Sequence, residues 1–379
     1  MKLNKLSILG LALVTMFFSN CSKSDDDSTT TQDTEYKFDL GKSVNRAFKG
    51  IVVDENNNAL SGVTIKMSGK VATTDANGVF TLSNVSVKER FAYLTAEKAG
   101  FVNGSRTLMP HSELNTLKIM MLQENLVKTI QTGEVSNVQL GNTTVQFDGA
   151  FSTEAGVPYT GAVKIYMNDL PSNDVNVFNK MPGTLFAIDS KGEYKGLETY
   201  GMVNVDLKGA NNEKLQIASG HKAKITMAIA PNQYDTAPNT MALWNFDEVE
   251  GVWKEDGFST RVGNNYVGEV SHFCWWNNDY AYTVATLKVT AKNESDNTPV
   301  QGVRCTITRL AGSTGDVLME LGITGANGTL SVGVPRNEVL IFRAYDQYGS
   351  LVWEENLPAS NQMTRNVTVL IPLQQRIKG

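Results

Sequence analysis

The sequence predicts an all-β protein built from tandem antiparallel β-sandwich domains. After residue 40, no long segment repeats its apolar residues with helical spacing. Short alternating or β-branched runs recur instead, such as 48–53, 63–67 and 163–167, with Gly, Asn and Asp between them. The 32 glycines suit turns that need a positive φ. Regular short strands joined by polar turns are typical of sandwiches or barrels.

Composition limits both the number of domains and the class of partner. The 379 residues allow two to four domains of about 100–200 residues each. Hydrophobic residues make up 41% and charged residues 19%, which is enough to give each domain a core. The net charge of −5 supplies no basic surface, so we expect no nucleic-acid partner.

The N-terminus predicts export and lipidation. Lys2 and Lys5 precede an apolar stretch at 6–18, the layout of a signal peptide. This stretch is shorter than the roughly 20 residues of a membrane-spanning helix. Residues 18–21, Phe-Ser-Asn-Cys, resemble a lipobox, which implies a lipoprotein signal peptide over 1–20 and lipidation of Cys21. The alternative is an ordinary secretory signal with a chance cysteine.

The segment after the cleavage site predicts a tether and a location. Residues 21–44 are polar and acidic at their start, so we expect a flexible linker. Ser22 to Asp27 resemble the acidic export signal of Bacteroidota surface lipoproteins. The resemblance implies a lipid anchor in the outer membrane, with the protein facing the cell exterior. The alternative is that these acidic residues form only a solvated linker.

Residues 45–123 carry an ordered set of strand and turn motifs. These are Gly50-Ile-Val-Val-Asp54, Leu60-Ser-Gly-Val-Thr-Ile65, Thr74-Asp-Ala-Asn-Gly-Val-Phe-Thr-Leu82 and Gly100-Phe101. Asn77-Gly78 is a strong hairpin signal. The set resembles the carboxypeptidase regulatory-like domain. This resemblance implies a seven-stranded transthyretin-like, broadly immunoglobulin-like sandwich that acts in folding or interaction and has no catalytic residues.

The same motif order returns over residues 285–373. Residues 299–307 parallel 59–67, 325–332 parallel 75–82, and 339–344 parallel 91–96. The offset grows from 240 positions at Gly302 to 250 at Gly328, so ten extra residues lie around 310–317. We therefore predict a second, divergent regulatory-like sandwich.

The middle region, 124–284, is predicted to be a β-rich extracellular domain. It carries Trp-x-Phe-Asp at 244–247, Gly-x-Trp at 251–253 and Ser-His-Phe-x-x-Trp-Asn at 271–277. These signatures resemble a region of Bacteroidota surface proteins and, more loosely, parts of the animal cartilage intermediate layer proteins. The resemblance implies a surface location. A break at 210–220 would divide the region in two, so its domain count stays open.

A search for reactive groups predicts no catalytic residue, no metal site and no cofactor. The histidines are His111, His221 and His272, and neither a zinc motif nor a nucleophile elbow occurs. Asp and Asn residues at 54–58, 75–78 and 293–297 predict turns rather than calcium loops. His272, with acidic residues upstream, is interpreted as structural, and a histidine–carboxylate pair is the alternative.

Tryptophans provide the tentative binding residues. Four of the five lie between 244 and 276. Exposed aromatic rings bind sugars and apolar partners, so Trp253, Trp275 and Trp276 are candidate contacts for a glycan or a surface protein. Core packing is the alternative. Adjacent strand residues face opposite ways, which predicts that one of Trp275 and Trp276 is buried and the other exposed near an edge.

Together these patterns predict a non-catalytic cell-surface lipoprotein that acts in binding, adhesion or scaffolding, with its Cys21 lipid anchor in the membrane. The alternative is an accessory subunit that positions a separate peptidase or a glycan-degrading or uptake complex. Cys274 and Cys305 both lie in apolar strand-like runs, and the sequence leaves open whether they pair or stay free.

Overall fold

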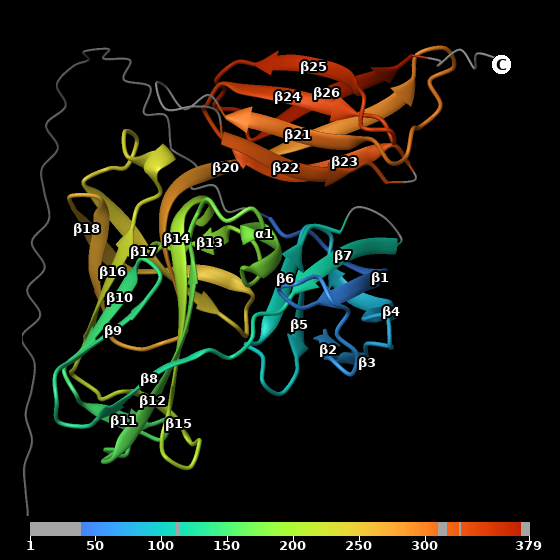
Figure 1. The fold of residues 1–379 in the computed structure, drawn as a ribbon. Coiled ribbons are helices and arrows are strands. Elements are labelled where there is room, and N and C mark those ends of the chain that lie inside the picture. Colours follow the sequence, from blue (N-terminus) through green and yellow to red (C-terminus); the bar gives the residue numbers. More distant parts are fainter. Residues whose placement is uncertain (1–38, 111–113, 310–316, 326, 373–379) are drawn as a thin grey trace, which may run out of the picture. The chain divides into compact units, whose positions relative to one another are not determined.

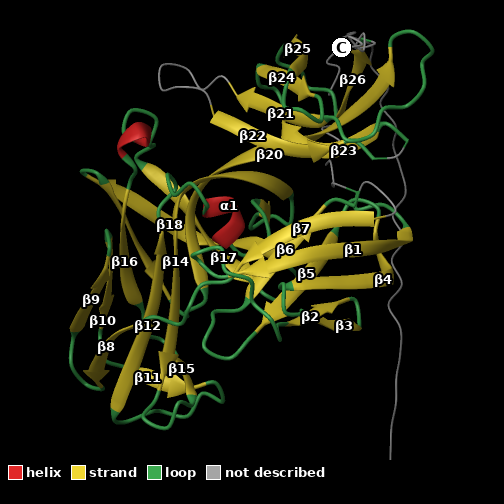
Figure 2. Cartoon of the chain, turned by 45° about the vertical axis from the view of Figure 1, so that its right-hand side comes forward, coloured by secondary structure: helices red, strands yellow, loops and turns green. Residues whose placement is uncertain are grey.

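The computed structural model describes residues 39–110, 114–309, 317–325 and 327–372. Strands make up 60% of the structure and helices 2%, which confirms the predicted all-β class (Figure 1). Figure 2 shows strands throughout this part of the chain, with the short helix α1 (Val177–Lys180) in red. No helix among the described residues is long and apolar enough to cross a membrane. The predicted signal peptide and Cys21 lie outside the described residues.

The first sandwich packs a three-stranded sheet, in the order β4-β1-β7, against a four-stranded sheet, β3-β2-β5-β6. Its strands are β1 (Ser43–Val53), β2 (Thr64–Met67), β3 (Lys70–Thr73), β4 (Val79–Lys88), β5 (Ala92–Glu97), β6 (Gly104–Leu108) and β7 (Leu114–Met120). β1 is antiparallel to β4 and parallel to β7. The alternating residues Phe48, Leu82 and Leu94 enter one core between the sheets. β1 begins two residues inside the predicted tether.

The C-terminal sandwich has the same strand order. The second half of β20 (Trp275–Asn293) pairs antiparallel with β23 and parallel with β26, as β1 does with β4 and β7. The facing sheet runs β22-β21-β24-β25. The strands are β21 (Arg304–Arg309), β22 (Val317–Ile323), β23 (Thr329–Pro335), β24 (Leu340–Tyr345), β25 (Leu351–Leu357) and β26 (Thr364–Ile371). The repeat read from the sequence is therefore a repeat of topology.

A buried threonine makes the same clamp in both sandwiches. Thr74 accepts a hydrogen bond from Val63 N–H at 2.9 Å and donates to the Leu60 carbonyl at 2.7 Å. Thr324 accepts from Val303 N–H at 3.1 Å and donates to the Val300 carbonyl at 2.8 Å. Each clamp satisfies backbone groups that would otherwise be buried without partners. Val300 and Val303 lie 240 positions after Leu60 and Val63, and Thr324 lies 250 positions after Thr74. The clamp residues therefore show the same offsets as the repeated motifs in the sequence.

The middle region forms one connected set of strands. They are β8 (Leu126–Gln131), β9 (Ser136–Leu140), β10 (Thr143–Phe147), β11 (Phe151–Thr153), β12 (Ala162–Leu170), β13 (Phe186–Ile188), β14 (Tyr194–Lys208), β15 (Lys214–Ile217), β16 (Ala223–Ala228), β17 (Thr240–Asp247), β18 (Val252–Val262) and β19 (Asn265–Val270). Segment 210–220 contains β15, which pairs with β14 and β11. It therefore lies within the sheet and does not separate two sheets.

Strand pairings in the middle region close a ring. β14 pairs with β20, β20 with β17, β17 with β18, β18 with β13, and β13 again with β14. Closure removes free sheet edges from these strands and encloses their inward side chains.

β20 continues from the middle region into the C-terminal sandwich without a break. Its first half pairs with β14 and β17, and its second half pairs with β23 and β26. The predicted boundary between 284 and 285 falls inside this 19-residue strand. The two regions are therefore joined by hydrogen-bonded strand and not by a linker.

Candidate ligand-binding pocket

The structure corrects the predicted binding role of the tryptophans. Trp253 is 0% exposed, Trp275 2% and Trp276 0%, so none offers a ring face to a ligand. Trp253 and Trp275 pack with Phe246 and Leu197 in a core at the closed strand ring. The aromatic residues crowd together in the sequence because they fill this interior.

Trp275 and Trp276 do point to opposite sides of β20, as strand alternation predicts. Trp275 belongs to the core with Trp253, whereas Trp276 belongs to a second core with Phe147 and Phe273. Trp276 Nε1 donates to the His272 carbonyl at 3.0 Å. The expected exposed ring is absent from this pair because both faces of the strand are covered.

A pocket of about 250 Å³ in the middle region is the best candidate site. It opens where the β9–β10 hairpin, the end of β12 and the segment after β16 meet. That segment includes a 3₁₀ turn, η1 (Pro231–Gln233). Its lining residues are Asn142, Thr143, Asp169, Pro171, Asn173, Gly201, Met227, Ala228, Ile229, Ala230, Pro231 and Tyr234. Non-local pairing assembles it, since Thr143 pairs with Met227 and Asp169 with Val203.

Asp169 supplies the charged group of the pocket. Its Oδ1 accepts a hydrogen bond from the Thr143 hydroxyl at 2.7 Å, and its Oδ2 accepts from Asn142 N–H at 3.2 Å. Gly141, with φ +55°, makes room for this carboxylate, because a Cβ there would lie 2.4 Å from Asp169 Oδ2. Burial raises the pKa of Asp169 above its usual value, although the bonds from Thr143 and Asn142 act against the rise.

Tyr234 supplies the aromatic wall, and Gln233 fixes the loop beside it. Tyr234 is half-buried and packs against a small core that includes Tyr200 and Ile229. Gln233 Nε2 donates to the Thr199 carbonyl at 2.9 Å, and Gln233 Oε1 accepts from the Ser172 hydroxyl at 2.6 Å. These bonds join both rim loops, so Gln233 is a positioning residue for the pocket.

The pocket combines polar groups at the rim with an apolar floor. Asn142 and Asn173 are exposed, while Met227 and Ile229 are buried beneath them. A concave apolar surface with a few convergent polar groups is the usual form of a small-ligand site. The sequence analysis missed it. No motif marks these residues, and only the Gly141-Asn142 turn is locally recognisable.

His272 lies near a thiol and a carboxylate, yet the group is poorly suited to catalysis. Cys274 Sγ lies 3.8 Å from His272 Nε2, and Asp256 Oδ2 lies 4.0 Å from His272 Nδ1. Burial raises the pKa of Cys274 to about 12 and lowers that of His272. The thiolate that would act as a nucleophile is therefore scarce at neutral pH. Cys274 and Cys305 are not joined in a disulfide.

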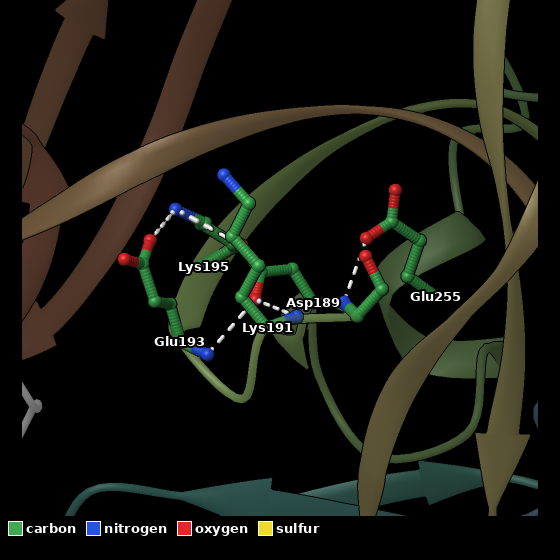
Figure 3. Close-up of polar contacts among 6 residues, drawn as sticks. Asp189, Lys191, Glu193, Lys195 and Glu255 are labelled. Atoms are coloured by element: carbon green, nitrogen blue, oxygen red, sulfur yellow. Dashed lines mark hydrogen bonds and ion pairs between the residues drawn. The ribbon is translucent and has the colours of Figure 1, made fainter.

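A second polar cluster forms the hairpin between β13 and β14 (Figure 3). Asp189 accepts hydrogen bonds from the N–H groups of Lys191 at 3.0 Å and Glu193 at 2.8 Å, and pairs with Lys195 at 3.3 Å. Glu255 accepts from Ser190 N–H at 2.7 Å. Burial raises the pKa of Asp189, but these partners bring it below its usual value. The carboxylates are thus occupied in holding the turn.

The remaining polar features of the sequence form turns or surface pairs. Asp54 accepts hydrogen bonds from the N–H groups of Asn56 at 2.9 Å and Asn58 at 2.8 Å, as expected of a turn. His221 Nδ1 lies 2.6 Å from Asp148 Oδ2, and both side chains are partly exposed. Among the residues that the structure describes, no group of three His, Cys, Asp or Glu side chains is placed to hold a metal. His111 lies outside the described residues.

Sequence comparison finds resemblance to cartilage intermediate layer proteins. Protein 2 of Homo sapiens is 28% identical over 149 residues, which cover 38% of this chain and 12% of that protein. Protein 2 of Mus musculus is 26% identical over 205 residues, covering 51% and 17%. This chain thus spans less than a fifth of the length of these relatives. No protein-family model matches the chain.

Solved structures give only distant likenesses. The Bacillus anthracis TIE protein aligns with 87% of this chain and 50% of its own, at 13% identity and a TM-score of 0.18. The major pilin SpaD of Corynebacterium diphtheriae aligns with 87% of this chain and 98% of its own, at 8% identity and a TM-score of 0.20. Scores this low do not indicate a shared whole-chain fold and carry no functional argument.

Proposed function

We propose that this chain is a non-catalytic, lipid-anchored surface protein whose middle region binds a small ligand or a ligand end. The observation that carries this proposal is the pocket at Asp169 and Tyr234. It offers groups that hold a ligand, but its lining residues include no accessible nucleophile beside a base. Thr143, whose hydroxyl is bonded to Asp169, is only 1% exposed as a residue, so its hydroxyl is poorly placed to attack a ligand.

The strand architecture supports a scaffolding role beside binding. β20 passes from the middle region into the C-terminal sandwich, so the two regions share hydrogen-bonded strand. Arg309 of β21 also pairs with Glu198 of β14 and with Glu338, and the three side chains are largely buried. Such connections suit a protein that presents a binding surface from a stiff support.

The N-terminal sequence supports the anchor and the location. Residues 1–20 resemble a lipoprotein signal peptide, and the acidic residues after Cys21 resemble an outward export signal. The regulatory-like resemblance of 45–123 and 285–373 fits an accessory surface module. A lipid on Cys21 would keep all these regions at the outer membrane.

Metabolic labelling with an alkyne fatty acid tests the anchor in the native host. We expect label on the wild-type chain and none on Cys21→Ser, which should be released from the membrane fraction. Protease added to intact cells should remove the wild-type protein. Equal labelling of both chains, or full protection from protease, would overturn the anchored surface location.

Crosslinking on intact cells tests the scaffolding part. We expect a reproducible set of surface neighbours that is lost when Cys21→Ser is released. Stoichiometric recovery with one peptidase or one glycan-degrading enzyme would instead identify the chain as an accessory subunit. Turnover of substrate by the purified chain itself, lost in His272→Ala, would contradict the non-catalytic proposal.

A further inference from the structure

We infer that the Asp169–Tyr234 pocket binds a neutral sugar residue of a glycan. This inference rests on the proposed binding function and names its ligand class. A sugar presents hydroxyl groups that both donate and accept hydrogen bonds, together with apolar C–H faces. The pocket matches this mixture with one carboxylate, two carboxamides, an aromatic ring and an apolar floor.

Each rim group can take part without giving up the bonds that hold it. A carboxylate has about four acceptor positions, and Asp169 uses one on each oxygen for Thr143 and Asn142 N–H. The side chains of Asn142 and Asn173 are exposed at the rim and can donate and accept. Tyr234 is half-buried and lines the pocket, so its ring is the group that would stack on a sugar.

The size of the pocket suits one sugar unit at the end or side of a chain. Its volume of about 250 Å³ would hold about eight water molecules at liquid density. Well-ordered waters on polar rim groups are replaced at little cost by hydroxyls that repeat their bonds. The rest of the glycan would extend past the exposed rim.

Charge excludes acidic glycans and disfavours a cationic partner. Asp169 is the charged side chain in the lining, and Lys and Arg are absent from it, so a uronate or sulfate would meet a carboxylate without a counter-ion. A lysine ammonium group would gain the carboxylate, but it only donates hydrogen bonds and so offers no acceptor to the N–H groups of Asn142 and Asn173. The carboxamides and the ring fit uncharged hydroxyls better.

The same lining argues for capture and against hydrolysis of the glycan. Most glycosidases place two carboxylates on either side of the bond that breaks. Here Asp169 is the single carboxylate among the lining residues. The pocket can therefore orient a sugar but lacks the acid–base pair for cleaving it.

Affinity electrophoresis of the detergent-solubilised full chain tests the inference. The gels contain either a neutral polysaccharide (mannan, laminarin, dextran or arabinoxylan) or an acidic one (polygalacturonate or heparin). We expect retardation by at least one neutral polymer and by neither acidic one. Tyr234→Ala and Asp169→Asn should each weaken it at least about tenfold, the effect of losing a ring contact or a charge-assisted hydrogen bond.

Matched controls separate the pocket from general surface effects. Asp235→Asn changes an exposed carboxylate next to Tyr234 that does not line the pocket, and Tyr348→Ala removes a ring that is 75% exposed. Both should bind like the wild type. Circular dichroism of every variant checks that it folds. Tyr234→Phe keeps the ring and should retain most of the binding. It is the fallback variant if Tyr234→Ala does not fold.

The outcomes distinguish this inference from the proposed function. Neutral-glycan binding that all variants retain would overturn the pocket assignment while leaving a binding protein. If no neutral polymer retards the wild-type chain, a neutral sugar is ruled out as the ligand. The labelling, protease and crosslinking experiments would still test whether the chain is an anchored surface protein. Asp169-dependent binding of a lysine-rich peptide, without glycan binding, would overturn the sugar in favour of a protein partner.

Discussion

Cys274 is a thiol that the protein interior keeps protonated. Burial raises its pKa to about 12, so only a very small fraction of the molecules carries the thiolate near neutral pH. In a Cys21→Ser chain we expect neither Cys274 nor the buried Cys305 to react with a disulfide reagent within minutes in the native state. Both should react in concentrated guanidinium chloride. Fast native labelling of Cys274 would show a reactive thiol and revive the pairing with His272.

Asp279 lies on β20 and is fully buried. Its Oδ2 accepts a hydrogen bond from the Asn277 side chain, and hydrogen bonds from Thr199 and from the Tyr200 backbone act against the effect of burial on its pKa. Burial raises the pKa of Asp279 well above its usual value. The folded protein therefore retains a proton that the unfolded chain loses, and stability falls as pH rises from about 4 through the raised pKa.

Asp279→Asn should remove this pH dependence. At neutral pH we expect the variant to be more stable than the wild type, because the Asn side chain is neutral without taking up a proton. Near pH 4 the two should be similar. Urea unfolding across this pH range measures the difference, with Asp235→Asn as an exposed control. A variant that is less stable at every pH would mean that the Asp279 carboxyl group makes hydrogen bonds that an Asn amide cannot replace.

At the scale of elements, the two sandwiches share a glycine that allows two strands to approach. Gly78 has φ +72°, and a Cβ there would lie 2.4 Å from the Val52 carbonyl oxygen. Gly328 has φ +71°, with the same 2.4 Å distance to the Ala291 oxygen. The Gly78 carbonyl also accepts a hydrogen bond from Val52 N–H at 2.8 Å, and the Gly328 carbonyl accepts one from Ala291 N–H at 2.7 Å.

Alanine at either position should cost about 2–4 kcal/mol, because backbone strain and a steric clash add. Gly100→Ala and Gly349→Ala are matched controls, since both have a positive φ but no heavy atom within 4 Å of the added Cβ. These should cost only about 1–2 kcal/mol from backbone strain. Urea unfolding midpoints make the comparison. Equal losses at Gly78 and Gly100 would refute the close-approach explanation.

The sequence predicts these elements well because their signals are local. Asn77-Gly78, the Leu60 run and their counterparts near Gly328 each mark a turn or strand within a few residues. The pocket has no such signal, because Asn142, Asp169 and Tyr234 meet through pairings between distant strands. Alternation likewise predicts opposite directions for Trp275 and Trp276 but not that a second core covers the other face.

At the scale of the whole molecule, the continuity of β20 should make two regions unfold together. The middle region and the C-terminal sandwich both depend on this strand. We expect one shared calorimetric transition for them in the wild type. A Gly-Ser-Gly insertion after Val284 should split it and move the C-terminal transition downward, by about 4–8 °C for each kcal/mol lost.

The same insertion after Asp296 is the control. This residue lies in an exposed turn between Asn293 and Thr298, beyond the end of β20. It should leave the shared transition intact. Two separate transitions in the unmodified chain would show that β20 joins the regions in space without coupling their stability.

The parallel strand pairs also determine when each sandwich can be completed. Ala47 pairs with Leu114, 67 positions later, and Thr286 pairs with Thr364, 78 positions later. Contacts this distant in sequence form slowly, because chain entropy is lost before the contacts compensate for it. At about 5–20 residues per second, synthesis of the second interval alone takes roughly 4–16 s. In a chain that we propose is exported, this delay would keep each sandwich open while the polypeptide is still being threaded through the membrane.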